Sequence, residues 1–145
     1  MRAPTSLLLT ALLCACATTP TAQGPSEQEL AAFLLYPMFD VLDCTQQGFI
    51  EAAELDEHLA FLFTPLDRDR SMALTPNEYV LAKTPEDRVR QELIFARADS
   101  NGDRRLTVAE YRLRLIDLID AADDNGDGEV TRSELASGSA AGRGG

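Results

Sequence analysis

Apolar and acidic residues recur along this chain in one fixed order, and the order is repeated four times. Each copy has an apolar residue, an aspartate four positions later, a branched aliphatic residue seven positions after the aspartate, and then a glutamate followed by Leu or Tyr. The aspartates are Asp43, Asp67, Asp99 and Asp123, and the glutamates are Glu54, Glu78, Glu110 and Glu134. Self-similarity of this kind indicates a repeated structural unit.

The spacing of the repeats predicts which helices are shared between them. We name the four acidic segments loop one (43–54), loop two (67–78), loop three (99–110) and loop four (123–134). Only twelve residues separate loop one from loop two, and the same number separates loop three from loop four. That length is too short for two helices and a turn. We therefore expect one helix at 55–66 to serve loops one and two, and one at 111–122 to serve loops three and four.

The segment between loops two and three is longer and contains Thr84-Pro85. This pair is a helix break followed by a proline suited to the first turn of a helix. It predicts two helices, at 76–83 and 86–98, joined by a turn.

The shared helices also predict which loops pair. At 1.5 Å per residue, a shared helix holds its two loops about 20 Å apart, so the loops at its two ends cannot pair with each other. Loops two and three should pair through short strands at Leu74 and Leu106. If the shared helices run antiparallel, loops one and four meet at the far end and pair at Ile50 and Val130.

Caps and prolines mark the ends of the remaining helices. Ser26 begins the first helix with a capping box to Glu29, and Pro37 inside that helix should kink it. Pro65 should end the helix that enters loop two early. The last helix is expected at about 131–137.

The net charge of the chain narrows the kinds of ligand that it is expected to bind. The chain has 24 acidic and 13 basic residues, a formal net charge of -11. An acidic chain is a poor binder of nucleic acid and a natural host for cations. The acids stand at fixed spacings, which favours a specific cation site over general solubility.

Loop four reads DDNGDGEVTRSE and carries oxygen-bearing side chains at alternate positions. Calcium is a hard cation that takes six to eight oxygen ligands, and a short loop supplies them from alternate positions. Glycine at the sixth position permits the positive-φ turn that wraps the chain around an ion. The expected ligands are Asp123, Asn125, Asp127, Glu129 through its carbonyl, Thr131 through water, and Glu134 through both oxygens.

Loop four satisfies the pattern D-x-[DN]-x-[DN]-G-x5-E in full, and through it the chain resembles the EF-hand family of calcium-binding proteins. The resemblance covers about residues 27–137. It implies an all-α fold of EF-hand helix-loop-helix repeats, with four loops of which two are degenerate, shared helices, and short strand pairing between loops. It also implies Ca²⁺ as the cofactor.

Loop three keeps the ligand pattern but has Arg104 at the glycine position. A non-glycine residue in left-handed backbone costs about 1–2 kcal/mol, and Arg104 and Arg105 add positive charge near the ion. Together these effects approach 3 kcal/mol, roughly a hundredfold in affinity, so we expect a weakened site that still binds. Its expected ligands are Asp99, Asn101, Asp103, Arg105 through its carbonyl, Thr107 and Glu110.

Loop two departs further from the pattern. Met72 replaces the glycine, Ser71 is a poorer ligand, and Arg68 and Arg70 offset the acids. Calcium binding and a purely structural role both stay open for this loop. Its ligands would be Asp67, Asp69, Ser71, Ala73 through its carbonyl, Thr75 and Glu78.

Loop one, DCTQQGFIEAAE, has Thr45 and Gln47 where the pattern has Asp or Asn. With two acidic ligands at principal positions, we expect it to bind calcium very weakly or not at all. Its expected role is structural, as the partner of a loop that binds.

A plainer interpretation exists for the Thr-x-x-Glu segments of loops two, three and four. Such a segment is also an ordinary capping box at the start of a helix. The acids upstream in the same loops make each glutamate a ligand as well.

The N-terminus is expected to be a signal peptide, not part of the fold. A short basic start precedes an apolar run at 7–13 that is too short to span a bilayer. The letters at 13–16, LCAC, resemble the bacterial lipobox and predict cleavage before Cys16 and its lipidation. Ordinary cleavage after Ala17 is the alternative.

The domain boundaries follow from these features. We expect a signal peptide at 1–15, a flexible tether at 16–25, an EF-hand domain at 26–137 and a disordered tail at 138–145.

The preferred interpretation is an exported calcium-binding protein that acts as a calcium-dependent binding or structural module. Calcium is its expected ligand, an unidentified envelope protein a candidate partner, and an outer-membrane lipid anchor facing the periplasm its expected location. A soluble periplasmic or secreted form is the alternative. A calcium sensor or buffer without a fixed partner also stays open.

An enzyme is the alternative from another class, as a small hydrolase. The chain has one histidine, His58, with neither a Cys-His pair nor a G-x-S-x-G motif. We therefore expect no enzymatic activity.

Overall fold

A computed structural model describes residues 24–141, and helices dominate it. The four strands are two residues each. In chain order the elements are α1 (Glu27–Leu35), the 3₁₀ helix η1 (Tyr36–Met38), α2 (Phe39–Leu42), β1 (Phe49–Ile50), the 3₁₀ helix η2 (Ala52–Glu54), α3 (Leu55–Phe63), β2 (Ala73–Leu74), α4 (Pro76–Tyr79), α5 (Pro85–Ala98), β3 (Leu106–Thr107), α6 (Val108–Ala122), β4 (Val130–Thr131) and α7 (Arg132–Ala141). A mostly helical fold with small antiparallel strand pairs is consistent with the EF-hand class.

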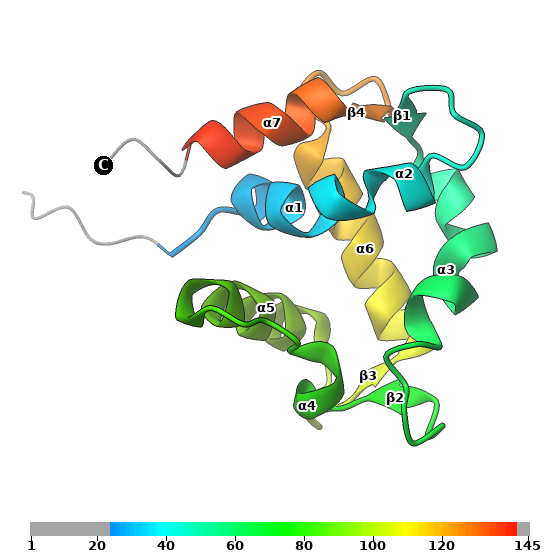
Figure 1. Cartoon of the computed structure of the whole chain (residues 1–145), viewed down its shortest axis with the longest axis vertical. Helices are drawn as coiled ribbons and strands as arrows, with labels where there is room; N and C mark the ends of the chain where they lie inside the picture. Colours follow the sequence, from blue (N-terminus) through cyan, green and yellow to red (C-terminus); the bar gives the residue numbers. More distant parts are fainter. Residues whose placement is uncertain (1–23, 142–145) are drawn as a thin grey trace, which may run out of the picture.

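The strands pair as the helix spacing predicts. β1 pairs antiparallel with β4 and places Ile50 opposite Val130. β2 pairs antiparallel with β3 and places Leu74 opposite Leu106. Figure 1 shows the two strand pairs at opposite ends of the molecule, with α3 and α6 running between them in opposite directions. Loop one therefore lies beside loop four, and loop two beside loop three.

The apolar positions of the sequence repeat form much of the core. All twelve of them are at most 6% exposed. They are Phe39, Phe63, Phe95 and Ile119 before the loops, Ile50, Leu74, Leu106 and Val130 in the strands, and Leu55, Tyr79, Tyr111 and Leu135 after the loops. Burial of apolar surface is the main favourable term in folding, so the repeat that carries the acids also stabilises the fold.

Aromatic members of the repeat meet at the end formed by β2 and β3. The ring centroids of Tyr79 and Phe95 lie 5.7 Å apart, and those of Phe63 and Tyr111 lie 5.8 Å apart. Tyr79 and Tyr111 are themselves in edge contact at 6.3 Å. Burial raises the pKa of Tyr111 to about 12 and also raises the pKa of Tyr79. Both phenols are therefore neutral across the physiological pH range.

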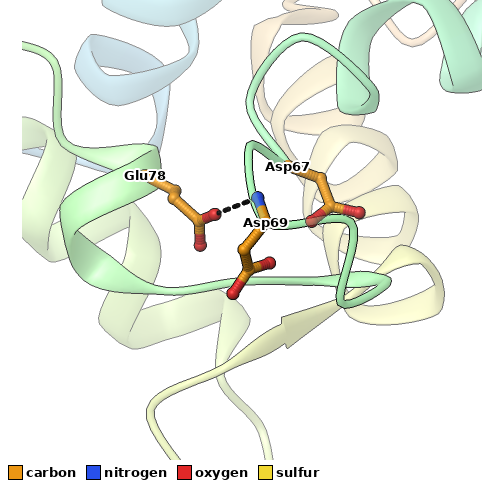
Figure 2. Close-up of side chains that lie close together, drawn as sticks. All are labelled: Asp67, Asp69 and Glu78. Atoms are coloured by element: carbon orange, nitrogen blue, oxygen red, sulfur yellow. Dashed lines mark hydrogen bonds between the residues drawn. The ribbon is translucent and has the colours of Figure 1, made fainter.

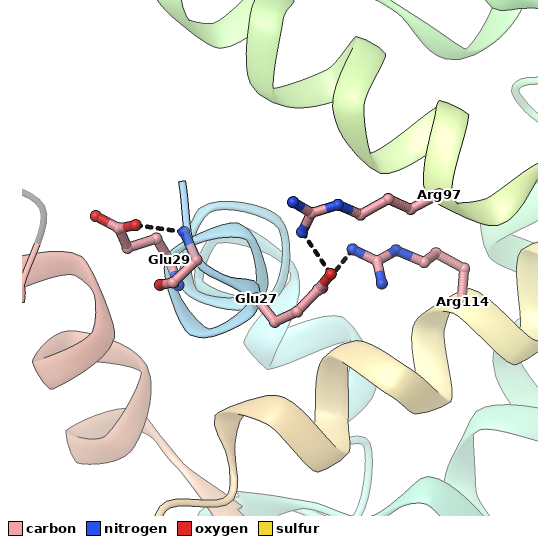
Figure 3. Close-up of polar contacts among 5 residues, drawn as sticks. Glu27, Glu29, Arg97 and Arg114 are labelled. Carbon is pink, nitrogen blue, oxygen red and sulfur yellow. Dashed lines mark hydrogen bonds and ion pairs between the residues drawn. The ribbon is translucent and has the colours of Figure 1, made fainter. Parts of the chain in front are cut away.

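The first helix is fixed at its N-terminus by both a cap and an ion-pair cluster (Figure 3). The predicted capping box is present: the amide of Glu29 donates to Ser26 Oγ, and the amide of Ser26 donates to the Glu29 carboxylate. Glu27 accepts from Arg114 Nη2 on α6 at 2.6 Å and also from Arg97 on α5. One carboxylate thus joins α1 to two other helices.

Two prolines act as the sequence predicts. Pro37 lies in η1, which divides the first helical segment into α1 and α2. Pro65 follows α3, which ends at Phe63, three residues short of the expected 55–66. Proline cannot donate a backbone hydrogen bond, and it disfavours helical conformation in the residue before it.

The helix predicted at 76–83 is wrong in its second half, because α4 ends at Tyr79. Val80 is extended, with φ −83° and ψ 94°. The amides of Leu81 and Ala82 donate instead to Gln91 Oε1 on α5, at 2.8 and 2.9 Å. A side-chain amide therefore replaces the helical carbonyls that these amides would otherwise need.

The end predicted for the last helix is also wrong. Residues 138–141 belong to α7, whereas the sequence assigned them to a disordered tail. The reason is a close approach to α1: a Cβ on Gly138 would lie 3.0 Å from the Gln28 carbonyl oxygen and 3.3 Å from Ala32 Cβ. Gly138 is thus a packing contact between α7 and α1, and packing continues the helix past 137.

The predicted signal peptide at 1–15, Cys16, the tether up to residue 23, and residues 142–145 lie outside the described residues. Within residues 24–141, none of the helices combines the length and the apolar character needed to cross a bilayer.

Candidate metal centres

The four loops share one backbone conformation at their fourth and sixth residues, all of which have positive φ between 56° and 93°. The fourth residues are Gln46, Arg70, Gly102 and Gly126, and the sixth are Gly48, Met72, Arg104 and Gly128. Such backbone costs a non-glycine residue about 1–2 kcal/mol. Loop four contains no strained residue at these positions, loops one and three contain one each, and loop two contains two.

The first aspartate of each loop fixes this conformation by accepting hydrogen bonds from the loop amides. Its Oδ1 accepts from the amide of the fifth residue, at 2.9 to 3.2 Å. Its Oδ2 accepts from the amide of the sixth residue, at 2.8 to 3.0 Å. These amides, that of Gly128 above all, hold the pKa of Asp123 below its ordinary value. The carboxylate is thereby kept ionised, as a metal ligand must be.

The closing glutamates of loops two, three and four are each held by a threonine through one oxygen. Glu78, Glu110 and Glu134 accept through Oε2 from the amide and the hydroxyl of the threonine three residues earlier, at 2.7 to 3.0 Å. The capping boxes that the sequence offered as the plainer interpretation are therefore present. Each capping box uses Oε2 of its carboxylate and leaves Oε1 outside the box.

These bonds also shift the acidity of two of the closing glutamates. The hydroxyl of Thr75 and then its amide lower the pKa of Glu78 to about 2. The amide of Thr107 and then its hydroxyl lower the pKa of Glu110. Both groups are anionic at neutral pH.

Loop four has a buried oxygen without a hydrogen-bond partner. Glu134 Oε1 is inaccessible to solvent and accepts no hydrogen bond from the residues at 24–141. Within the loop, Asn125 Oδ1 accepts from the Asp127 amide, and Asp127 Oδ1 accepts from the Glu129 amide, both at 2.8 Å. A buried unpaired carboxylate oxygen is unfavourable by about 1–3 kcal/mol or more. A cation in this loop would pair it, so the donor set fits a hard metal ion.

Loop three repeats this arrangement with Arg104 in the place of glycine. Arg104 has φ 63°, and its amide donates to Asp99 Oδ2 at 2.8 Å, as the Gly128 amide donates to Asp123. Ser100 Oγ donates to Glu110 Oε1 at 3.0 Å, so this loop satisfies the oxygen that loop four leaves free. Arg104 at the glycine position therefore strains the backbone, while its amide keeps the hydrogen bond to the first aspartate.

Loop two brings its acids closest together, as Figure 2 shows. Ligand atoms of Asp67, Asp69 and Glu78 lie within 4.8 Å of one another, which holds for no other group of three acidic, His or Cys side chains in the described part of the chain. The amides of Arg68 and Asp69 donate to Glu78 Oε1, at 3.1 and 3.4 Å, and draw the carboxylate over the loop.

Loop two also contains a hydrogen bond between two of its candidate ligands. Ser71 Oγ donates to the Ala73 carbonyl at 2.9 Å. Both groups are candidate ligands, and both oxygens keep a free lone pair in this bond, so it is compatible with binding of a cation. The sequence placed loop two third among the four loops, and the crowding of its acids was not evident from the letters.

Loop one is closed by its own side chains. Thr45 Oγ1 and Gln47 Nε2 both donate to Glu54 Oε1, at 3.1 and 3.2 Å. Glu54 Oε2 accepts from the Glu51 amide at 3.3 Å. Both oxygens of Glu54 therefore have hydrogen-bond donors from within loop one.

A comparison with known protein families supports these observations for loop four. Residues 115–138 match a family model described as EF hand. The match covers the second half of α6, all of loop four and most of α7. No curated protein matches the chain. EF-hand domains bind Ca²⁺, so the match supports calcium binding and an EF-hand relationship for this part of the chain.

Proposed function

We propose that this protein binds calcium through loops four and three, with loop two as a weaker third site. The proposed ligands of loop four are Asp123, Asn125, Asp127, the Glu129 carbonyl, Thr131 through water, and Glu134. Those of loop three are Asp99, Asn101, Asp103, the Arg105 carbonyl, Thr107 and Glu110. Calcium would contribute its charge and a flexible shell of six to eight oxygens.

The buried Oε1 of Glu134 is the observation that carries the proposal most directly. Its partner oxygen is fixed by Thr131, so the carboxylate is held in place while one oxygen has no donor among residues 24–141. Together with the EF-hand match over the same residues, this supports a cation as the missing partner.

The expected order of calcium affinity among the loops follows the backbone strain and the quality of their ligands. Loop four has glycine at both left-handed positions, whereas loop three has Arg104 at one of them and loop two has Arg70 and Met72. In addition, loop two has Ser71, a poorer ligand, at the fifth position, where loops three and four have aspartate. We expect affinity to fall from loop four to loop three and then to loop two.

Calorimetric calcium titration of the purified protein tests the proposal. One or two sites with measurable heat are expected, and the tightest belongs to loop four. Magnesium at the same concentration should compete poorly, because it demands a near-ideal octahedral shell and dehydrates reluctantly. The absence of any calcium-dependent heat would contradict the proposal.

We further propose that the protein is exported and anchored by lipid on Cys16, and that it serves as a calcium-dependent binding or structural module in the bacterial envelope. The support is the sequence pattern at 1–16 and the short segment between Cys16 and the start of α1. Mass spectrometry of the mature N-terminus tests this. A lipid-modified Cys16 is expected, whereas an unmodified terminus after Ala17 would instead indicate soluble export.

A further inference from the structure

We propose that loop one is a closed, metal-independent loop in which Gln47 and Thr45 take the place of a cation, and that it positions loop four to bind calcium. The proposal deepens the function proposed above and rests on it where calcium affinity is concerned. Gln47 and Thr45 are assigned as positioning residues, since neither belongs to loop four.

In loop one, the side chains at three ligand positions form hydrogen bonds with one another instead of contacting an ion. Thr45 and Gln47 are the third and fifth residues of the loop, and Glu54 is the twelfth. In the other three loops these positions hold proposed ligands. Here the Thr45 hydroxyl and the Gln47 amide both donate to Glu54 Oε1, at 3.1 and 3.2 Å. Two neutral donors thereby supply what a cation would supply to the same oxygen.

The hydrogen bonds of Oε1 on the closing glutamate differ between loop one and its partner, loop four. In loop four this atom, on Glu134, is buried without a donor among the described residues. In loop one the corresponding atom, on Glu54, has two donors from the loop itself. In loop one these donors are the side chains at the third and fifth positions, so the groups that would bind an ion are paired with one another instead.

The rest of loop one is fixed in the same way as the loops that carry acidic ligands. The amides of Gln47 and Gly48 donate to the two oxygens of Asp43, each at 2.9 Å. Gln46 and Gly48 take the left-handed conformation common to all four loops. The closed form of loop one hence has the backbone conformation that a calcium loop requires at these positions.

Contacts connect this closed loop to the ligands of loop four. Phe49 of β1 stands opposite Thr131 of β4. The amide and hydroxyl of Thr131 hold Glu134 Oε2, each at 2.8 Å. Loop one and the closing ligand of loop four are therefore connected through the paired strands β1 and β4.

A second contact joins the helices next to these loops. The Arg132 guanidinium lies 4.2 Å from the ring centroid of Phe39 and pairs with Asp40. Phe39 and Asp40 belong to the helix that enters loop one, and Arg132 begins the helix that leaves loop four. Both contacts favour a fixed position of loop four relative to a loop one that is already closed.

Backbone amides give a separate reporter for each loop. The amide of the sixth residue donates to the first aspartate, so its NMR shift responds when that aspartate binds an ion. The reporters are Gly48 for loop one, Met72 for loop two, Arg104 for loop three and Gly128 for loop four.

The first experiment compares Gln47→Ala with Gln46→Ala in calcium titrations of the full chain. The Gln46 side chain makes no hydrogen bond within residues 24–141, which makes it a matched control. Gln47→Ala should weaken calcium binding at Gly128 about fivefold, the effect of one lost hydrogen bond. The calcium affinity measured at the Arg104 reporter should change less than about twofold, because loop three lies at the other end of the molecule. Equal weakening at both reporters, or none at Gly128, would overturn the proposal.

The second experiment needs no calcium binding by the natural loops. Hydrogen exchange is measured in the calcium-free protein across β1 and β4 and, for comparison, across β2 and β3. Gln47→Ala should speed exchange in β1 and β4 alone. Unchanged exchange there would overturn the proposal even if calcium binds as expected. If the natural protein shows no calcium response at Gly128, the proposed function fails, while this experiment still decides the role of Gln47.

The third experiment restores an ion to loop one. The double variant Thr45→Asp with Gln47→Asp replaces the two neutral donors by carboxylates at ligand positions. The Gly48 reporter, unresponsive to calcium in the natural protein, should then respond to it. In calcium, the double variant should also bind the ion at loop four, measured at Gly128, with an affinity within about twofold of the natural value. A silent Gly48 in the double variant would show that Gln47 and Thr45 do not stand at the place of a cation.

Discussion

Glu110 and Asp123 lie at opposite ends of one helix. Glu110 is the third residue of α6 and accepts hydrogen bonds from Thr107, which caps the helix, while Asp123 caps the C-terminal end. The helix dipole places partial negative charge at the C-terminal end, which favours a cation bound by Asp123 there. Because the two residues are proposed ligands of loops three and four, calcium would stabilise α6 at both of its ends.

Removal of calcium should therefore destabilise the whole fold. A ligand at a hundredfold excess over its Kd contributes about 2.7 kcal/mol, which corresponds to roughly 10 °C in Tm for a domain of this size. Thermal unfolding followed by circular dichroism, with calcium and with a chelator, measures the difference. The same Tm in both conditions would contradict calcium binding to the native state.

The strain at Arg104 predicts a gain of function. Arg104→Gly should tighten calcium binding by loop three about tenfold or more, because it relieves about 1–2 kcal/mol of backbone strain and removes a positive charge. Arg105→Gly is the matched control, since it removes the same charge from a residue without positive φ. Titration followed at the loop-three amides distinguishes the two. Equal effects of both variants would mean that charge alone weakens this loop.

The cluster at Glu27 should contribute to stability. Arg114 is 5% exposed and pairs with Glu27 at 2.6 Å, whereas Arg112 pairs with Asp56 near the surface. Arg114→Ala should lower the free energy of unfolding by about 2 kcal/mol, a value reduced from that of a fully buried pair because Glu27 is 43% exposed. Arg112→Ala should change it by less than about 1 kcal/mol. Denaturant unfolding of both variants provides the test, and equal losses would contradict this ranking.

The lowered pKa of Glu78 predicts acid sensitivity in loop two. The folded value, about 2, lies below the ordinary value of 4.5. A depressed pKa contributes stability that is fully present above the unfolded value and is lost as the pH falls from about 4.5 toward 2. NMR titration of the Glu78 carboxyl in calcium-free protein should give a midpoint near 2. Thr75→Val removes the hydroxyl donor and should raise that midpoint, and an unchanged midpoint would assign the shift to another cause.

Spacing and apolar pattern predicted the arrangement of the fold well. Helix spacing predicted that Ile50 stands opposite Val130 and Leu74 opposite Leu106, because a shared helix keeps its two loops apart and the two shared helices were expected to run antiparallel. The errors lie where long-range contacts override local preference. Gln91 draws the amides after Tyr79 out of a helix, and Gly138 extends α7 by packing against α1.

The candidate sites were predicted less completely. The motif identified the acids of each loop, and the glycine at the sixth position explained one left-handed turn. The second such turn, at the fourth position, was missed, although Gly102 and Gly126 mark it in loops three and four. The closure of Glu54 by Gln47 was also missed, because it depends on where side chains point rather than on the motif.

The central claim is that loop four binds calcium through Glu134. The most direct test compares Glu134→Gln with Glu129→Gln by titration at the Gly128 amide. Both variants remove one negative charge from the same loop, but Glu129 is proposed to ligate through its carbonyl, which the substitution keeps. Glu134→Gln should abolish the loop-four response or weaken it at least a hundredfold, while Glu129→Gln should weaken it less than about threefold. An isotherm unchanged by Glu134→Gln, or equal weakening by both variants, would contradict the account.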